Sequence, residues 1–297
     1  MARQPTLKQL SYLSALAEHG HFGNAARACH VSQSTLSAAI IELESLLGVA
    51  LVERNNRRVL LTALGDEVIQ RSRSILTDVE DLVATCEASA EPFSGRMRLG
   101  VIPTIAPYTL PHLLKQLRRK HPDFQLFIRE DLSARLVNAL QLGELDVLLL
   151  ALPFAADKVE TRHLFDDEFV FACPPDYPLA ADAKVHTADL GSHELLLLED
   201  GHCLRDHALE ACSLNEVELK IPYQATSLTT IVQMVANGIG VTLLPQMALD
   251  ARILSGTGVK AHQFKESGIS RSIGLMWRSN SPRREEFSAL GDFIAAS

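Results

Sequence analysis

Strand-like and helix-like segments alternate through the larger, C-terminal part of the chain, and this alternation constrains the fold most. Short apolar runs typical of buried strands are separated by segments with apolar residues at helical spacing. The expected strands are 97–102, 125–128, 146–150, 169–172, 241–244 and 272–277, and the first expected helices are 107–120 and 132–142. Strands that alternate with helices form parallel sheets covered on both faces. Because the chain starts a second set near residue 169 and later returns, we expect two α/β subdomains with a cleft between them.

The first part of the chain has a different pattern, which predicts a helix-turn-helix. Thr6 is a plausible N-cap for a helix with leucines at helical spacing, and a short helix follows at 25–30. Ser32 caps a third helix that continues to about residue 44. This arrangement presents a recognition helix to the DNA major groove. The candidate DNA-binding side chains at its first turn are Ser32, Gln33, Ser34, Thr35 and Ser37.

A basic turn between two strand-like runs follows this motif. Arg54, Arg57 and Arg58 flank the turn, and they suit phosphate contact or insertion into the minor groove. An arginine-rich turn is more often a solvated surface, but its place directly after a helix-turn-helix favours a wing that contacts DNA. The net charge of −8 means that DNA contact must come from such a local patch. A long amphipathic helix over 63–90 then predicts a dimerising linker.

Two cysteines, Cys203 and Cys212, lie in a segment that we expect to be helical. Nine residues of helix span roughly 13 Å at about 1.5 Å per residue, whereas a disulfide needs Cα atoms within about 7 Å. A disulfide between them would therefore require the local backbone to rearrange, as expected of a redox switch. His202, Arg205 and a nearby helix N-terminus predict a lowered pKa for the Cys203 thiol. The alternative is two inert, buried thiols.

Composition excludes several classes of protein. The chain has five cysteines but no C-x-x-C pair, so we expect neither a thioredoxin-type motif nor a cysteine-based metal site. The N-terminus has no apolar signal segment, and the longest uncharged apolar run, 147–156, is too short to span a membrane. We expect a cytoplasmic protein without cofactors, in which any disulfide is transient.

Motifs along nearly the whole chain resemble one family. Residues 7–66 resemble the winged helix-turn-helix of LysR-type transcriptional regulators, and the effector half resembles the peroxide-sensing OxyR branch of that family. The N-terminal matches include Ala25, Ala26, 31–37, Arg54 and 61–65, and the effector matches include 100–104, 198–206, Cys212, 225–228 and 240–245. Ser34, Ala39, Ile41 and Glu42 depart from the family pattern and make the recognition helix less basic. More of the phosphate binding is then expected from the wing.

The resemblance implies roles for individual residues. Peroxide would oxidise Cys203 to a sulfenic acid, and Cys212 would then close a disulfide. The residues implied to line the peroxide pocket are Thr104, Ser133, His202, Arg205 and Arg271. Each also has a simpler interpretation from the sequence. Thr104 and Ser133 could be helix caps, His202 a surface turn residue, and Arg271 an ion-pair partner of Glu266 or another carboxylate.

Together these patterns predict an α/β protein with three parts. We expect a winged helix-turn-helix domain at 1–65, a linker helix at 66–92, and a regulatory domain at 93–297 resembling periplasmic binding proteins. Within it, subdomain I comprises 93–165 and 269–297, and subdomain II comprises 166–268. The expected partners are promoter DNA, hydrogen peroxide, further copies as a homodimer or homotetramer, RNA polymerase, and a glutaredoxin- or thioredoxin-type reductant.

We expect a peroxide-sensing regulator that is not an enzyme, because each switching event consumes one peroxide. Three alternatives remain open at the level of sequence. The chain could be a regulator of the same fold that binds a small-molecule co-inducer. It could be a thiol peroxidase, although such an enzyme should not begin with a DNA-binding module. A transport-type solute-binding protein is disfavoured by the missing signal segment.

Overall fold

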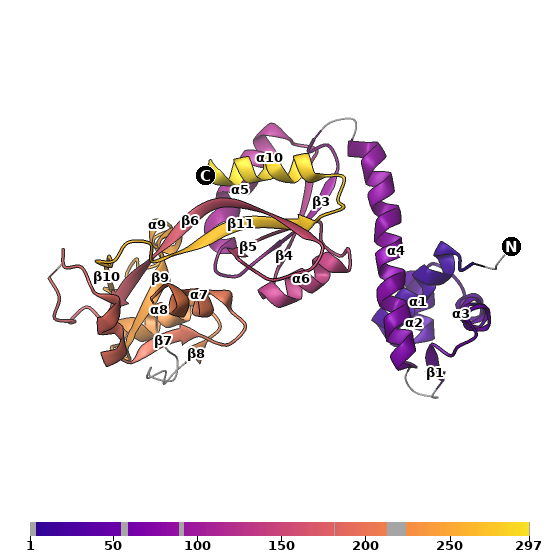
Figure 1. Ribbon diagram of the computed structural model, residues 1–297, viewed down its shortest axis with the longest axis horizontal. Helices are drawn as coiled ribbons and strands as arrows, with labels where there is room; N and C mark the ends of the chain where they lie inside the picture. Colours follow the sequence, from indigo (N-terminus) through magenta and orange to yellow (C-terminus); the bar gives the residue numbers. More distant parts are fainter. Residues whose placement is uncertain (1–3, 55–58, 89–91, 181, 213–223, 297) are drawn as a thin grey trace. The chain divides into compact units, whose positions relative to one another are not determined.

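The computed structural model describes residues 4–54, 59–88, 92–180, 182–212 and 224–296 (Figure 1). The chain divides into two compact units. The first holds Met1–Ser89 with Gln141–Gly143, and the second holds Ala90–Leu140 with Glu144–Ser297. Within the described ranges, every helix is too short or too polar to cross a membrane. We describe each unit by itself.

The N-terminal unit is built around a helix-turn-helix. Its elements are α1 (Leu7–His19), α2 (Phe22–Ala28), α3 (Gln33–Leu47), β1 (Val52–Arg54), β2 (Val59–Leu61) and α4 (Ala63–Ala88). Thr6 and Gln9 form a capping box at the start of α1, which satisfies two backbone N–H groups that the helix leaves unpaired. Apolar side chains of α1 and α3, such as Leu16 and Ile40, are fully buried and form the core of this unit. The predicted helix-turn-helix is therefore present.

Helix α4 carries two kinds of apolar side chain. Ile69 is buried against the N-terminal core, whereas Ile75, Leu82 and Val83 have exposed fractions of 45%, 66% and 53%. Large exposed apolar side chains along one helix are typical of a surface that a partner covers. Helix α4 begins at Ala63, as predicted, and the last two residues of the predicted helix, 89 and 90, lie outside the described residues.

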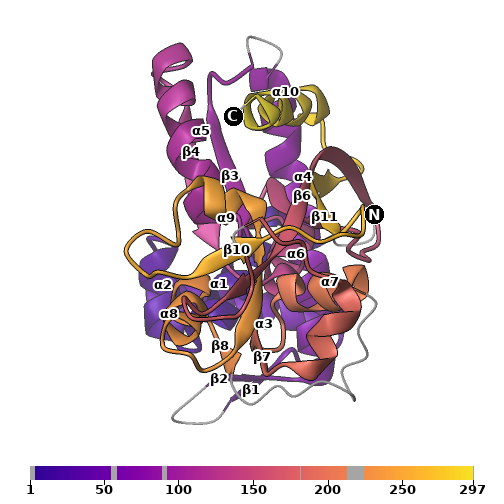
Figure 2. The ribbon, with the colours of Figure 1, turned by 90° about the vertical axis from the view of Figure 1, so that its left-hand side faces the viewer.

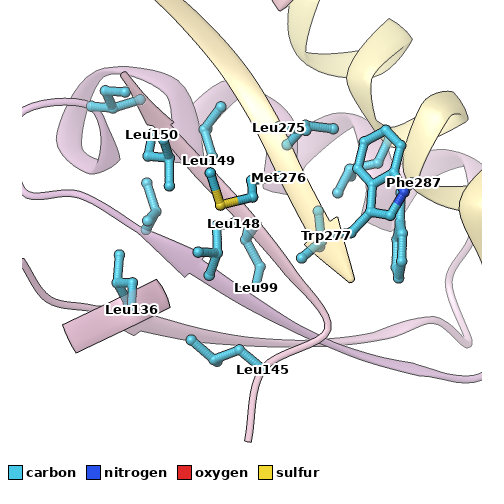
Figure 3. Packing of buried hydrophobic residues seen from close by; sticks show 14 of the residues in the cluster. Leu99, Leu136, Leu145, Leu148, Leu149, Leu150, Leu275, Met276, Trp277 and Phe287 are labelled. Carbon is cyan, nitrogen blue, oxygen red and sulfur yellow. The ribbon is translucent and has the colours of Figure 1, made fainter. Parts of the chain in front are cut away.

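The first lobe of the regulatory unit has a mixed sheet. Strand β3 (Arg96–Val101) lies between β4 (Gln125–Glu130) and β5 (Val147–Leu152) and pairs with both in parallel. Helices α5 (Ala106–Lys120), α6 (Ser133–Gln141) and α10 (Arg284–Ala295) belong to this lobe. The core packs leucines of β5 against Leu275, Met276, Trp277 and Phe287, as Figure 3 shows.

Two long strands continue from this lobe into the second. Strand β6 (Val159–Cys173) pairs antiparallel with β11 (Ser270–Arg278) in its first part and with β9 (Val241–Pro245) and β10 (Lys260–His262) in its last. The two strands lie side by side in Figure 1. The sheet order is β4-β3-β5-β11-β6-β9-β7-β8. From the sequence we predicted only 169–172 of β6 as a strand and expected parallel sheets, so the antiparallel β6–β11 ribbon is a correction. The polar first half of β6 hides its strand character because its residues are only partly buried.

The second lobe contains the cysteine-bearing helix. This helix is α7 (Cys203–Ala211), and the other elements of the lobe include β7 (Leu195–Leu198), β8 (Gln224–Ala225), α8 (Leu228–Ala236) and α9 (Gln246–Asp250). In Figure 2, α7, β7 and β8 lie at one end of the regulatory unit, and α5 and α10 lie at the other. Strand β7 is fully buried between β9 and β8, and α7 begins a few residues after it. The fold is α/β, as predicted.

Candidate functional site

Cys203 is the first residue of α7 and lies where the two lobes meet. Gly201 has a φ of +94°, a backbone conformation that side chains other than hydrogen rarely allow, and this turn ends the passage from β7. His202 is the N-cap of α7. The half-buried Cys203 side chain packs against the apolar core of the first lobe, although α7 belongs to the second. The thiol is thus held between lobes by the start of a helix.

A buried ion pair lies beside this thiol. Arg271 of β11 and Asp167 of β6 face each other across the antiparallel ribbon, with Nε 3.0 Å from Oδ2. The exposed fractions of their side chains are 0% and 2%. The sequence assigns Arg271 either a place in a peroxide pocket or an ion pair with Glu266 or another carboxylate. The structure shows an ion pair, and its partner is Asp167. A buried pair of this kind is stable only where further hydrogen bonds satisfy both groups.

Those further bonds come from Thr104 and the start of α9. The guanidinium of Arg271 donates from Nη1 to the Thr104 hydroxyl at 2.9 Å and from Nη2 to the Thr104 carbonyl at 3.0 Å. Asp167 accepts a hydrogen bond from the backbone N–H of Met247 at 3.0 Å. Thr104 does not cap α5, whose N-cap is Ile105. We call Thr104, Ser133, Asp167, Cys203 and Arg271 the Cys203 cluster.

The surroundings of Cys203 shift the pKa of its thiol in opposite directions. Burial raises the pKa of Cys203, and the Asp206 carboxylate adds to this rise. The Ser133 hydroxyl, the Arg271 cation and the Ala151 backbone oppose it by favouring the thiolate. The net shift is upward, so the predicted lowering of the Cys203 pKa is wrong. In the reduced protein at neutral pH, this thiol is mostly protonated.

His202 and Arg205, the basic residues next to Cys203 in sequence, do not lower the pKa of its thiol as expected. His202 is itself buried, and this burial lowers the pKa of its imidazole, which is therefore neutral at pH 7. Arg205 lies toward the preceding loop, with Nη1 3.4 Å from the Leu198 carbonyl and Nε 3.4 Å from Asp200. Both residues support the turn before α7. The cation that acts on Cys203 is Arg271, which is distant in sequence.

Two residues of this site were missed from the sequence, Asp167 within the Cys203 cluster and His207 beside it. Asp167 had no local signal, because its role depends on the pairing of β6 with β11. His207 lies four residues after Cys203 on α7, a spacing that places two side chains on the same helix face and could have identified it. Its Nδ1 atom is buried and has no hydrogen-bond partner among the described residues. Burial lowers the pKa of His207, and the charge of Arg271 lowers it further.

Cys212 has a contrasting environment at the other end of α7. It is the C-cap residue, has an exposed fraction of 3%, and belongs to the apolar core of the second lobe. Burial raises the pKa of its thiol to about 12, and Glu266 contributes to the rise. Both cysteines are free thiols. With α7 intact, their Cα atoms are roughly 13 Å apart at about 1.5 Å per residue, as predicted for a helix.

A second candidate site is the start of α3. Ser32 is the N-cap, and its Oγ accepts from the Thr35 backbone N–H at 3.1 Å and lies 2.8 Å from the Ser34 Oγ. Ser32, Gln33, Ser34 and Thr35 are exposed, and Ser37 is half-buried. Arg54 ends β1. Arg57 and Arg58 lie outside the described residues. The helix start thus offers a short row of polar side chains to a partner.

The acidic residues of α3 have partners within the N-terminal unit. Glu42 accepts a hydrogen bond from Gln9 of α1 at 3.2 Å. Glu44 accepts from the backbone N–H groups of Leu51 and Val52 at 2.9 and 3.1 Å, which joins α3 to β1. The departure at Glu42 therefore places a carboxylate that braces α1 against α3.

Comparison with protein families matches both units. Residues 7–66 match the bacterial regulatory helix-turn-helix protein of the lysR family, and residues 90–297 match the LysR substrate binding domain. The HTH-type transcriptional regulator EstR of Acinetobacter baylyi is 40% identical over 294 residues, covering 99% of this chain and 97% of EstR. The DNA-binding transcriptional dual regulator OxyR of Escherichia coli is 39% identical over 290 residues, covering 98% and 95%.

Solved structures agree with this assignment. Full-length OxyR of Pseudomonas aeruginosa, as a cysteine-to-aspartate variant, matches with a TM-score of 0.81 at 35% identity, covering 98% of this chain and 95% of that one. Corynebacterium glutamicum OxyR, as an H2O2-bound cysteine-to-serine variant, matches with a TM-score of 0.69 at 34% identity, covering 100% and 93%. The two lobes and the winged helix-turn-helix thus have a common explanation: the chain belongs to the LysR family of transcriptional regulators.

Proposed function

We propose that this regulator senses hydrogen peroxide through Cys203 and Cys212. The observation that carries the proposal is the Cys203 cluster, in which the Ser133 hydroxyl and the buried Arg271 guanidinium act on the Cys203 sulfur and the Thr104 hydroxyl holds that guanidinium in place. The relatives named OxyR support it, and one of them is described as binding H2O2. A hydroperoxide is small and polar, so hydrogen-bond donors and acceptors suit it better than an apolar cavity.

The chemistry follows from the charges around the thiol. The thiolate of Cys203 attacks one peroxide oxygen, the O–O bond breaks, and the product is a sulfenic acid. Charge develops on the leaving oxygen in this step. The Arg271 guanidinium is held by Asp167 and Thr104 before any ligand arrives, so it can stabilise that charge without reorganising. The Thr104 and Ser133 hydroxyls would orient the peroxide.

The second step must disrupt α7. Cys212 can reach the sulfenic acid only if the helix unwinds, because a disulfide needs Cα atoms within about 7 Å. Unwinding also removes Cys212 and Leu209 from the core of the second lobe. We propose that this repacking changes how regulatory domains associate and re-spaces the DNA-binding domains. A cellular thiol reductant of glutaredoxin or thioredoxin type would reverse it.

Promoter DNA is the proposed target of the N-terminal unit. The exposed start of α3 would enter the major groove, with Arg54, Arg57 and Arg58 on phosphates or in the minor groove. The exposed side chains of α4, Ile75, Leu82 and Val83, support its pairing with a second copy in a homodimer or homotetramer. RNA polymerase is the further partner that activation would require. We place the protein in the cytoplasm.

A second candidate function is a regulator that binds a small-molecule co-inducer and has passive cysteines. The observation that favours it is EstR, a transcriptional regulator whose name does not refer to peroxide and which is 40% identical over 294 residues. Titration of free thiols with a slight molar excess of peroxide separates the two. Loss of two thiols per chain supports peroxide sensing, and retention of all thiols supports the co-inducer.

The decisive test of the disulfide is non-reducing peptide mapping after brief exposure to peroxide. We expect the peptides that contain Cys203 and Cys212 to become linked. The Cys203→Ser variant should keep the DNA footprint of the reduced protein after peroxide treatment, and Cys173→Ser serves as the matched control. A peroxide-dependent footprint in Cys203→Ser would contradict the proposal.

A further inference from the structure

The proposed reaction at Cys203 requires two proton transfers, one from the thiol and one to the leaving oxygen. Cys203 is mostly a thiol in the folded protein, but the thiolate is the nucleophile. Breaking the O–O bond also releases hydroxide, which is a poor leaving group unless it receives a proton. A group that takes the proton from sulfur and delivers it to the leaving oxygen would meet both needs.

His207 has the geometry for this task. It lies on α7 one helical turn beyond Cys203, and side chains at positions i and i+4 of a helix are neighbours at about 5–6 Å between Cβ atoms. That spacing puts the sulfur and the ring on the same face of α7. The buried Nδ1 atom lacks a hydrogen-bond partner among the described residues. A buried polar atom without a partner is costly, which points to a ligand as its partner.

The charges around His207 keep the imidazole neutral. Burial and the Arg271 cation of β11 lower its pKa, while Glu210 and Asp206 on its own helix oppose them. The net shift is downward from 6.5. A neutral imidazole has one N–H donor and one free lone pair, so it can accept one proton and donate another. A lysine or a carboxylate at this position would lack one of the two abilities at pH 7.

We propose that His207 is the proton-transfer residue of the peroxide reaction at Cys203. The inference rests on the proposed function. The imidazole accepts the proton of the Cys203 thiol, the S–O bond forms as the O–O bond breaks, and the imidazolium returns a proton to the leaving oxygen. The sum is one thiol and one hydrogen peroxide converted to one sulfenic acid and one water. Sulfur is oxidised and the peroxide is reduced.

The test uses the full chain with Cys212→Ala, so that the sulfenic acid accumulates and can be trapped with dimedone. Mass spectrometry of the Cys203 peptide gives the second-order rate constant for peroxide from pH 5 to 8. We expect His207→Gln to lower this constant about 100-fold at pH 7, a typical contribution of acid–base catalysis. His112→Gln, an exposed histidine of α5, is the matched control and should leave it unchanged.

Two further readouts distinguish proton transfer from a structural role. Alkylation of Cys203 by iodoacetamide releases iodide, which needs no proton, so His207→Gln should slow it far less than it slows the peroxide reaction. In the parent, the peroxide rate should level off above the pKa of His207, which lies below 6.5, because neutral imidazole then accepts the thiol proton. In His207→Gln the rate should instead keep rising about tenfold per pH unit up to pH 8, because only the thiolate already present can react.

Each result bears on one of the two proposals. Equal slowing of alkylation and oxidation, or an unchanged pH profile, would overturn the role of His207. A parent chain whose Cys203 does not react with peroxide at all would overturn the proposed function itself. If His207→Gln does not fold, His207→Asn, which keeps a hydrogen-bonding group near the Nδ1 position, gives the same comparison.

Discussion

The two ends of α7 hold chemically similar side chains in opposite environments. Cys203 at the N-terminal end faces a buried guanidinium and a hydroxyl and packs against the neighbouring lobe. Cys212 at the C-terminal end lies in the apolar core of its own lobe. The N-terminal end places a cation beside its thiol, whereas the C-terminal end buries its thiol among apolar side chains. Under the proposed function, this contrast predicts that oxidation starts at Cys203 and that access to Cys212 depends on the helix.

The largest expected effect comes from removing the cation at the Cys203 end. Arg271→Leu leaves Asp167 as an uncompensated buried charge, so the free energy of unfolding should fall by about 3–5 kcal/mol. Urea denaturation of the regulatory transition measures this loss. The double variant Arg271→Leu, Asp167→Leu should recover most of it. A loss below about 1 kcal/mol in the single variant would show that the ion pair is not the structural centre of the site.

The second expected effect is a difference in thiol reactivity. Under native conditions at pH 8, iodoacetamide should modify the half-buried Cys203 faster than Cys212, because Cys212 is 3% exposed and a pKa of about 12 leaves roughly 10⁻⁴ of it as thiolate. Peptide-resolved mass spectrometry gives both rates, and Cys173, whose pKa is raised to about 11, is an internal control. Equal rates at the two ends would mean that α7 opens before oxidation.

The third effect concerns stability at high pH. The folded pKa of Cys212 lies above its unfolded value of 9.0, so its contribution to stability is complete below pH 9 and is lost as pH rises toward 12. At pH 10 the expected loss from this thiol is about 1.4 kcal/mol, since one pKa unit corresponds to about 1.36 kcal/mol. Urea denaturation of reduced protein at pH 8 and 10 measures it. The loss should shrink in Cys212→Ala, and an identical loss there would assign it to other groups.

The smallest effect comes from the carboxylate beside Cys203. Asp206 raises the pKa of Cys203, so Asp206→Asn should lower that pKa and speed alkylation at pH 7 about 2- to 3-fold, as expected for an exposed charge. Alkylation rates against pH give the shift directly. Glu210→Gln, seven residues beyond Cys203 on the same helix, is the matched control. Slower alkylation in Asp206→Asn would reverse the assigned sign.

Features that depend on neighbouring residues were predictable from the sequence. The capping box at Thr6, the recognition helix after Ser32 and the helix from Cys203 all follow from spacings of a few residues. The first half of β6 was missed because its residues are polar and only partly buried, so they lack the apolar pattern of a buried strand. This segment is a strand because it pairs with β11.

The sequence by itself determined the helix-turn-helix, the α/β alternation and the helix that separates two cysteines, because each rests on local periodicity and capping. Only the tertiary structure decided the electrostatics of the Cys203 site. The cation that favours the Cys203 thiolate is Arg271, whose ion-pair partner Asp167 is 104 residues away in sequence. Arg205, which is close to Cys203 in sequence, pairs with Asp200 instead. The pKa of a buried thiol depends on the solvent it loses and on the charges that folding brings near it, and neither quantity is a property of local sequence.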